Sequence, residues 1–147
     1  MPFFRKFLVS SLLIILFIQN ALASEGGSYT SAPSKRMDLS SVNHWFTYTL
    51  PITKNPARGA TITKIFYQYA LGQKNIREGT LVVNLCSIHS SRCVDISNSE
   101  SGETVAFRGE SALSQFIIYY KVVNHRSIGL VTSKGPTLIT VNWTTNK

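Results

Sequence analysis

The stretch NLCSIHSSRCVDI contains both cysteines of the chain, Cys86 and Cys93, with His89 between them. Cysteine and histidine at this spacing could bind a metal ion, support thiol redox chemistry or form a disulfide bond. A structural zinc site uses four protein ligands, usually in two close pairs, whereas the other histidines, His44 and His125, are isolated. A C-x-x-C redox motif is absent. A disulfide is therefore the favoured interpretation, and a Cys86–His89–Cys93 metal site or free thiols are the alternatives.

The first residues indicate that the chain is exported. Arg5 and Lys6 precede an apolar run at residues 7–18, and the small-residue sequence ALA follows at 21–23. This is the pattern of a cleaved secretory signal peptide, and the run is shorter than the ~20 apolar residues that span a bilayer. We therefore predict a signal peptide over residues 1–23. Exported proteins meet an oxidising environment, which favours the disulfide.

Composition limits the classes of partner. Cleavage would leave 124 residues, enough for one domain. It would remove Arg5 and Lys6, so the net charge of +8 would fall to about +6. Such a charge favours anionic partners. Nucleic acid is disfavoured because the remaining basic residues are scattered singly, apart from Lys35-Arg36. The mature chain has no further long apolar run, so we expect no stable membrane insertion.

The elements that must position the cysteines are short strands. From residue 44 onward, runs rich in Val, Ile, Thr, Tyr and Phe alternate with clusters of Gly, Pro, Asn and Ser. No segment has a sustained helical period. This pattern predicts an all-β fold: a single-domain antiparallel β-sandwich or barrel of about seven or eight short strands over residues 44–147. The expected strands are residues 44–50, 60–71, 79–86, 92–97, 103–109, 115–123 and 136–143, with a further short one within 128–132.

Two details of this pattern are specific. The cysteines fall on successive expected strands, so a hairpin would set them opposite each other, and closing it would stabilise the fold by ~2–3 kcal/mol. In the strand at 60–71, alternation places Ile62 and Phe66 on one face and Ile65 on the other. The preceding segment, residues 24–43, is expected to be partly mobile, although Tyr29 or Leu39 could tie parts of it into a sheet.

Catalytic chemistry has little support. Hydrolase, metalloprotease and phosphate-loop motifs are absent. A triad of His125, Asp95 and a serine is a weak alternative, as is a glycosidase-like pair of Glu100 and Glu103. We expect binding and no enzyme activity, cofactor or metal. Six aromatic residues could form a binding face, with core packing as the simpler interpretation: Phe66, Tyr67, Tyr69, Phe116, Tyr119 and Tyr120.

The order of four segments resembles the FlhE family of flagellar proteins, and the likeness spans nearly the whole mature chain. The loop between the cysteines looks longer here than in the family, so no role is carried over to His89. The matching segments are Glu25-Gly26-Gly27; Leu85-Cys86-Ser87 with Ser91-Arg92-Cys93-Val94-Asp95; Ser101-Gly102-Glu103-Thr104 with Phe107; and Ile139, Val141, Asn142 and Trp143.

The resemblance implies a β-rich periplasmic protein that is not an enzyme. It would bind the flagellar export apparatus or basal body proteins and limit proton leakage, as a plug or a chaperone. A homo-oligomer is compatible with this role. Two other classes remain open. One is a secreted binding module for a glycan or protein, or a small inhibitor. The other is a pilus-type subunit or chaperone that uses β-strand addition through its EGGSYTS segment. A pH-sensing role for His44 or His125 is a further hypothesis.

Overall fold

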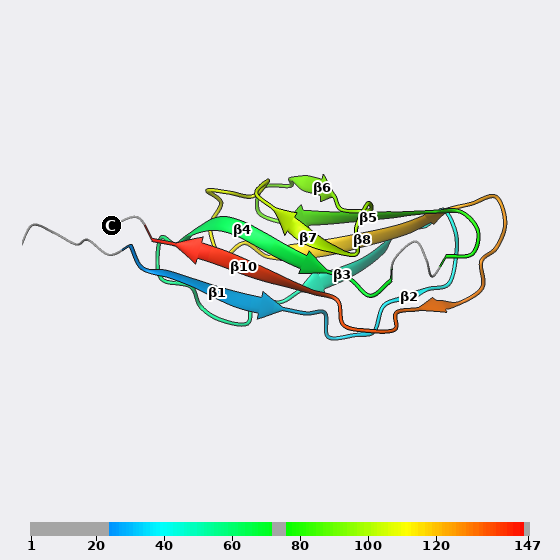
Figure 1. Cartoon of the computed structure of the whole chain (residues 1–147), viewed down its shortest axis with the longest axis horizontal. Coiled ribbons are helices and arrows are strands. Elements are labelled where there is room, and N and C mark those ends of the chain that lie inside the picture. Colours follow the sequence, from blue (N-terminus) through cyan, green and yellow to red (C-terminus); the bar gives the residue numbers. More distant parts are fainter. Residues whose placement is uncertain (1–23, 72–75, 146–147) are drawn as a thin grey trace, which may run out of the picture.

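The computed structural model describes residues 24–71 and 76–145, and the expected signal peptide lies outside the described residues (Figure 1). Every paired strand is antiparallel, and the described residues form no helix, so the predicted all-β class is confirmed. Seven of the ten strands correspond to the expected ones, and an eighth shares only its last two residues with the strand expected at residues 103–109. The strands are β1 (Gly26–Ser31), β2 (Asp38–Leu39), β3 (Phe46–Leu50), β4 (Thr61–Gln68), β5 (Thr80–Ser87), β6 (Cys93–Asp95), β7 (Ser101–Thr104), β8 (Phe116–Val123), β9 (Val131–Thr132) and β10 (Leu138–Thr144).

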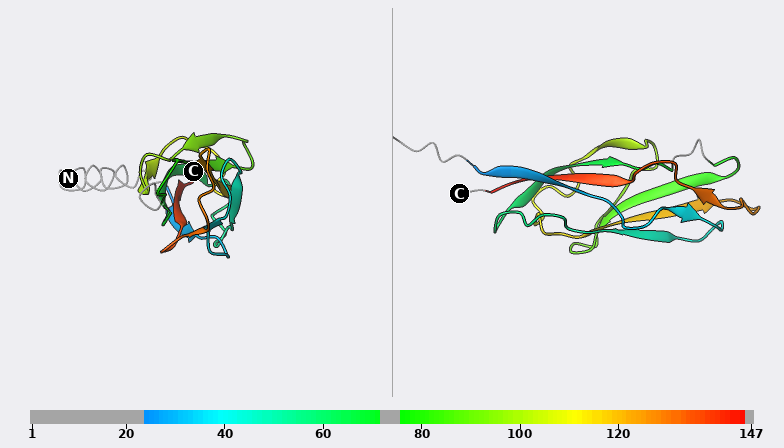
Figure 2. Two further views of the ribbon diagram at one scale, coloured as in Figure 1. Left: turned by 90° about the vertical axis from the view of Figure 1, so that its right-hand side faces the viewer. Right: turned by 90° about the horizontal axis from the view of Figure 1, so that it is seen from below.

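The strands form two four-stranded sheets and a short ribbon. One sheet has the order β1-β10-β4-β7, the other has the order β3-β8-β5-β6, and β2 pairs with β9 (Figures 1 and 2). The two sheets share one hydrophobic core. Val83 and Ile118 from the second sheet are fully buried in it, together with Val141 from the first. Tyr69, which follows β4, packs edge-to-face on Tyr120 of β8 with ring centroids 5.9 Å apart.

Residues 24–43 contribute β1 and β2. Tyr29 and Leu39, the two residues expected to tie this segment into a sheet, are buried. The Tyr29 hydroxyl donates a hydrogen bond to the carbonyl oxygen of Ala112 at 3.1 Å. β1 pairs along its length with β10, from Gly26 opposite Thr144 onward. The segment considered for donation to a neighbour is therefore paired within its own chain.

A β-bulge at Thr63 changes the faces of β4. Ile62 and Lys64 pair with consecutive residues of β10, which leaves Thr63 without an opposite residue. Because a bulge adds one residue to its strand, it reverses the alternation beyond it. Ile62 and Ile65 are consequently both buried, while Phe66 is 41% exposed. The expectation that Ile62 and Phe66 share a face is therefore wrong.

Candidate functional site

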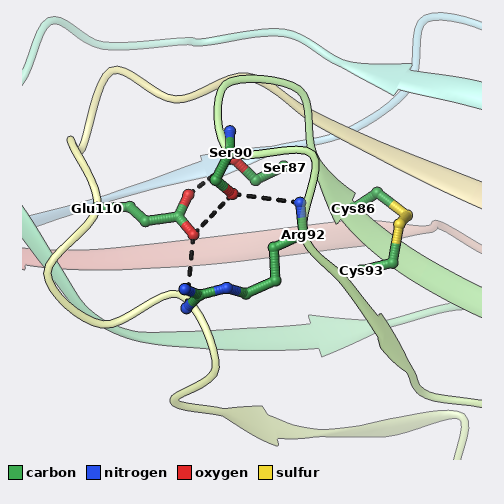
Figure 3. The surroundings of a disulfide bond; sticks show 6 residues. All are labelled: Cys86, Ser87, Ser90, Arg92, Cys93 and Glu110. Atoms are coloured by element: carbon green, nitrogen blue, oxygen red, sulfur yellow. Dashed lines mark hydrogen bonds and ion pairs between the residues drawn. A yellow bond between two sulfur atoms is a disulfide. The ribbon is translucent and has the colours of Figure 1, made fainter.

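The two cysteines close a hairpin between β5 and β6. Cys86 and Cys93 are directly opposite in the register, with Cα atoms 4.1 Å apart and a sulfur–sulfur distance of 2.01 Å (Figure 3). Directly opposed residues in antiparallel strands are close enough for this bond. Both sulfurs are engaged in the disulfide, so neither can serve as a thiolate ligand beside His89. The predicted disulfide-closed hairpin is present in the fold.

The loop of this hairpin is held by the carboxylate of Glu110, whose side chain is 11% exposed. The hydroxyl of Ser87 donates to Oε2 at 2.8 Å, and the hydroxyl of Ser90 donates to Oε1 at 2.9 Å (Figure 3). The guanidinium of Arg92 lies 3.8 Å from Oε1. The largely buried carboxylate of Glu110 therefore accepts hydrogen bonds from two serine hydroxyls and lies close to one guanidinium group. Such charge-assisted hydrogen bonds are stronger than neutral ones.

Backbone contacts attach the same loop to the chain between β7 and β8. The Arg92 guanidinium donates to the carbonyl of Ala106, and the amide of Ile88 donates to the carbonyl of Gln115 at 2.9 Å. Among the interactions of the described residues, no histidine takes part in this network. The arrangement can hold a loop rigid, but it lacks the base that would activate a serine. Sequence reasoning missed Glu110, because nothing local distinguishes this glutamate from a solvated one.

The structure does not bring His125 and Asp95 together. Asp95 is opposite Asn84 on β5, whereas Val123, just before His125, is opposite Thr80. Four residues of strand separate these positions, or about 13 Å. The Asp95 carboxylate instead accepts hydrogen bonds from the hydroxyl and backbone amide of Ser97, which lower the pKa of this carboxyl. A triad built on His125 and Asp95 is therefore not supported.

The structure gives no support to a catalytic pair of Glu100 and Glu103 either. Glu103 forms an ion pair with Lys64 at 2.9 Å, with side chains 52% and 33% exposed. The carbonyl of Glu100 accepts the backbone amide of Tyr69 at 2.8 Å. An exposed ion pair on a sheet face is not the enclosed setting in which two carboxyl pKa values are driven apart.

The aromatic residues do not form one binding face. Tyr69, Phe116 and Tyr120 are buried, whereas Phe66 is exposed on the solvent face of β4. Burial raises the pKa of Tyr69 to about 12 and that of Tyr120 well above its usual value. Three of the six are thus core residues, as the simpler interpretation predicted. Tyr67 stacks on Tyr69, with ring centroids 6.5 Å apart.

A feature that sequence reasoning missed is a cationic groove lined by residues of the connection before β5 and of the segments on either side of β9. These segments lie at the end of the molecule away from the start of β1 and the end of β10 (Figure 1). This groove has a volume of about 800 Å³ and contains Arg77, Arg126 and Lys134, with Glu78 as its acidic lining residue. Its cations come from separate connections between strands. No motif in the sequence brings them together, because each stands alone among neutral neighbours or beside an acid.

The described residues contain no group of three His, Cys, Asp or Glu side chains that could hold a metal ion. Within the same part of the chain, no helix is long and apolar enough to cross a membrane.

The chain is a small antiparallel β-sandwich protein in which a disulfide closes the hairpin of β5 and β6. A family model described as "Flagellar protein FlhE" matches residues 46–144. The chain therefore belongs to the FlhE family of flagellar proteins, which is not a known enzyme family.

The comparison with solved structures supports the fold. The structure titled "Crystal Structure of FLHE" is similar, with a TM-score of 0.64 and 21% sequence identity, and the match covers 80% of this chain and 96% of that one. A search of curated protein sequences gave no significant match.

Proposed function

We propose that this protein is an exported flagellar accessory protein that binds the flagellar export apparatus and limits proton leakage through it. The observation that carries the proposal is membership of the FlhE family over residues 46–144. The predicted signal peptide at residues 1–23 supports export, and the Cys86–Cys93 disulfide suits an oxidising compartment such as the periplasm.

The fold is compatible with a plug or a chaperone and supports no catalytic mechanism. Two sheets around one core, with a loop tied by a disulfide and by Glu110, make a body that can obstruct an opening without deforming. Positive charge near a pore also raises the electrostatic barrier to proton passage. Steric obstruction and electrostatic repulsion would act in the same direction.

The test is a measurement of cytoplasmic pH with a pH-sensitive fluorescent reporter. Wild-type cells and cells without the gene are compared, each with flagellar expression on and off. We expect acidification only in the deletion strain and only when flagella are expressed, and we expect a plasmid copy of the gene to reverse it. Equal pH in both strains under both conditions would remove proton restraint and favour the secreted binding module.

A further inference from the structure

We infer that the cationic groove is a docking site for an acidic, extended segment of a partner protein. The inference deepens the proposed function and rests on it in taking the partner to be a protein. It specifies the chemistry of that partner: carboxylate side chains spaced along an extended backbone, with apolar side chains between them.

The first observation is the charge of the groove. Arg77, Arg126 and Lys134 are exposed, and none of their side chains forms a hydrogen bond or ion pair with another residue that the structure describes. Lys64 of β4, by contrast, is neutralised by its ion pair with Glu103. Unpaired cations that line one hollow attract carboxylates and bind them with little rearrangement.

The second observation is that a smaller groove continues the first. It has a volume of about 280 Å³, and its lining includes Lys35, Arg36 and Lys134. Lys134 therefore lies on both grooves and joins them. Together they present five cations and, among the described lining residues, one acid, Glu78. A track of hollows fits an extended chain better than it fits the flat surface of a bilayer.

The third observation is apolar surface in the same place. Leu130 is 69% exposed, the largest exposed fraction among the large hydrophobic residues described. Ile76 and Ile128 also line the groove, and both are more buried than Leu130. An isolated exposed leucine needs no explanation, but one beside unpaired cations in a hollow suits a mixed acidic and apolar ligand.

Hydrogen bonds anchor the backbone of the segments that carry two of the cations, Arg126 and Lys134. The side chain of Asn124 accepts hydrogen bonds from the backbone amides of His125, at 2.7 Å, and Arg126, at 3.3 Å. Its backbone carbonyl is bound by the amide group of Asn43 at 2.6 Å. On the other side, the amide of Ser133, next to Lys134, donates to the carbonyl of Met37 at 2.9 Å. A preorganised site loses less entropy when it binds.

The test is fluorescence anisotropy with a labelled synthetic peptide in which Glu and Asp alternate with Leu and Ser. A matched peptide has Gln and Asn in place of the acids. We expect the purified protein to bind the acidic peptide, to bind the neutral one at least about tenfold more weakly, and to lose affinity as salt is raised. Equal affinity for the two peptides, or no binding of either, would overturn the inference.

Two triple variants with the same charge change locate the binding. Arg77→Gln, Arg126→Gln and Lys134→Gln neutralise the groove. Lys54→Gln, Arg58→Gln and Arg108→Gln neutralise three exposed cations in the connections at the opposite end (Figure 1). We expect a loss of about tenfold from the groove variant and less than about threefold from the control. Equal losses would show a general charge effect and contradict the site.

A vesicle arm separates a protein partner from a membrane. The same variants are mixed with vesicles of phosphatidylglycerol and phosphatidylethanolamine. Vesicle binding that depends on the groove, without peptide binding, would overturn the inference in favour of a membrane surface. The peptide assay is independent of cytoplasmic pH. Groove-dependent peptide binding with equal cytoplasmic pH in the two strains would therefore uphold the docking site and reject proton restraint. Acidification in the deletion strain, without groove-dependent peptide binding, would reject the docking site and leave proton restraint supported.

Discussion

Trp143 lies over Gly27 on the adjacent strand. The two residues are paired in the register of β1 and β10. A methyl group placed on Gly27 would be 2.4 Å from the indole carbon Cζ2 and 2.8 Å from Cε2. The indole also packs against the hydrophobic core. The absence of a side chain at Gly27 is therefore what allows this tryptophan to cover the end of the sheet.

Gly27→Ala is expected to destabilise the fold, because the indole would have to leave its packed position. We expect a loss of about 1–3 kcal/mol in the free energy of unfolding, measured by urea unfolding with tryptophan fluorescence. Gly26→Ala is the control, since its methyl group would have its nearest contact at 3.4 Å, on the carbonyl oxygen of Trp143. The free energy of unfolding of Gly26→Ala should stay within about 0.5 kcal/mol of the wild-type value. Equal stability of the two variants would contradict the packing argument.

The double substitution Cys86→Ser and Cys93→Ser should lower stability by about 2–3 kcal/mol, because the unfolded chain regains the entropy of an open loop. The measurement is urea unfolding with and without a reducing agent. Reduction should bring the wild-type protein down to the stability of the variant and leave the variant unchanged. A loss below about 0.5 kcal/mol would mean that the Glu110 network alone fixes the hairpin.

Glu110→Gln tests that network directly. It keeps the shape of the side chain but removes the charge that accepts from Ser87 and Ser90 and faces Arg92. We expect a loss of about 1–2 kcal/mol, since the carboxylate is largely buried. Glu103→Gln is the control, because it breaks only the exposed pair with Lys64 and should cost less than about 0.5 kcal/mol. Chemical unfolding of both variants under the same conditions gives the comparison.

Stability should fall in alkaline solution because of buried tyrosines. Burial raises the pKa of Tyr29 and of Tyr69 to about 12, above the ordinary value of 10.0. The folded state therefore holds the phenolic protons more tightly. This contribution is complete below about pH 10 and is lost as the pH rises toward about 12.

Urea unfolding at a series of pH values between about 9 and 12 measures this loss. Tyr29→Phe should be less stable at neutral pH, because it loses the hydrogen bond to Ala112, yet its stability should decline less steeply with pH. Identical slopes for the wild-type protein and Tyr29→Phe would contradict a contribution of Tyr29 to this pH dependence.

Local pattern was sufficient for seven strands because their Val, Ile, Tyr and Phe residues alternate or cluster between turn residues. β1 lacks that signal, since GGSYTS contains one large apolar residue, and it is held by pairing with β10 and by burial of Tyr29. The strand expected at residues 103–109 is also different. β7 ends at Thr104, and Phe107 is buried in the following turns against Phe116, with ring centroids 5.1 Å apart. The apolar side chain of Phe107 was therefore a correct indicator of burial, but it did not indicate a strand at this position.

The same reasoning explains which parts of the site were predictable. Cys86 and Cys93 are close in sequence and flank a turn, so local geometry was enough to pair them. Arg77, Arg126 and Lys134 meet only because β5, β8 and β10 place three connections side by side. The long-range pairing of the strands brings these three residues close together. Their proximity could not be predicted from single basic residues scattered along the sequence.

The last strand of the chain, β10, lies in the interior of its sheet, between β1 and β4. Its pairing with β1 joins residues that are far apart in the sequence; Thr30 and Thr140, for example, are 110 positions apart. Contacts of such long range form late, because a long loop must close first. A chain without β10 has no strand to join β1 to β4. The sheet that contains the first strand of the fold is therefore completed only when the last strand is in place.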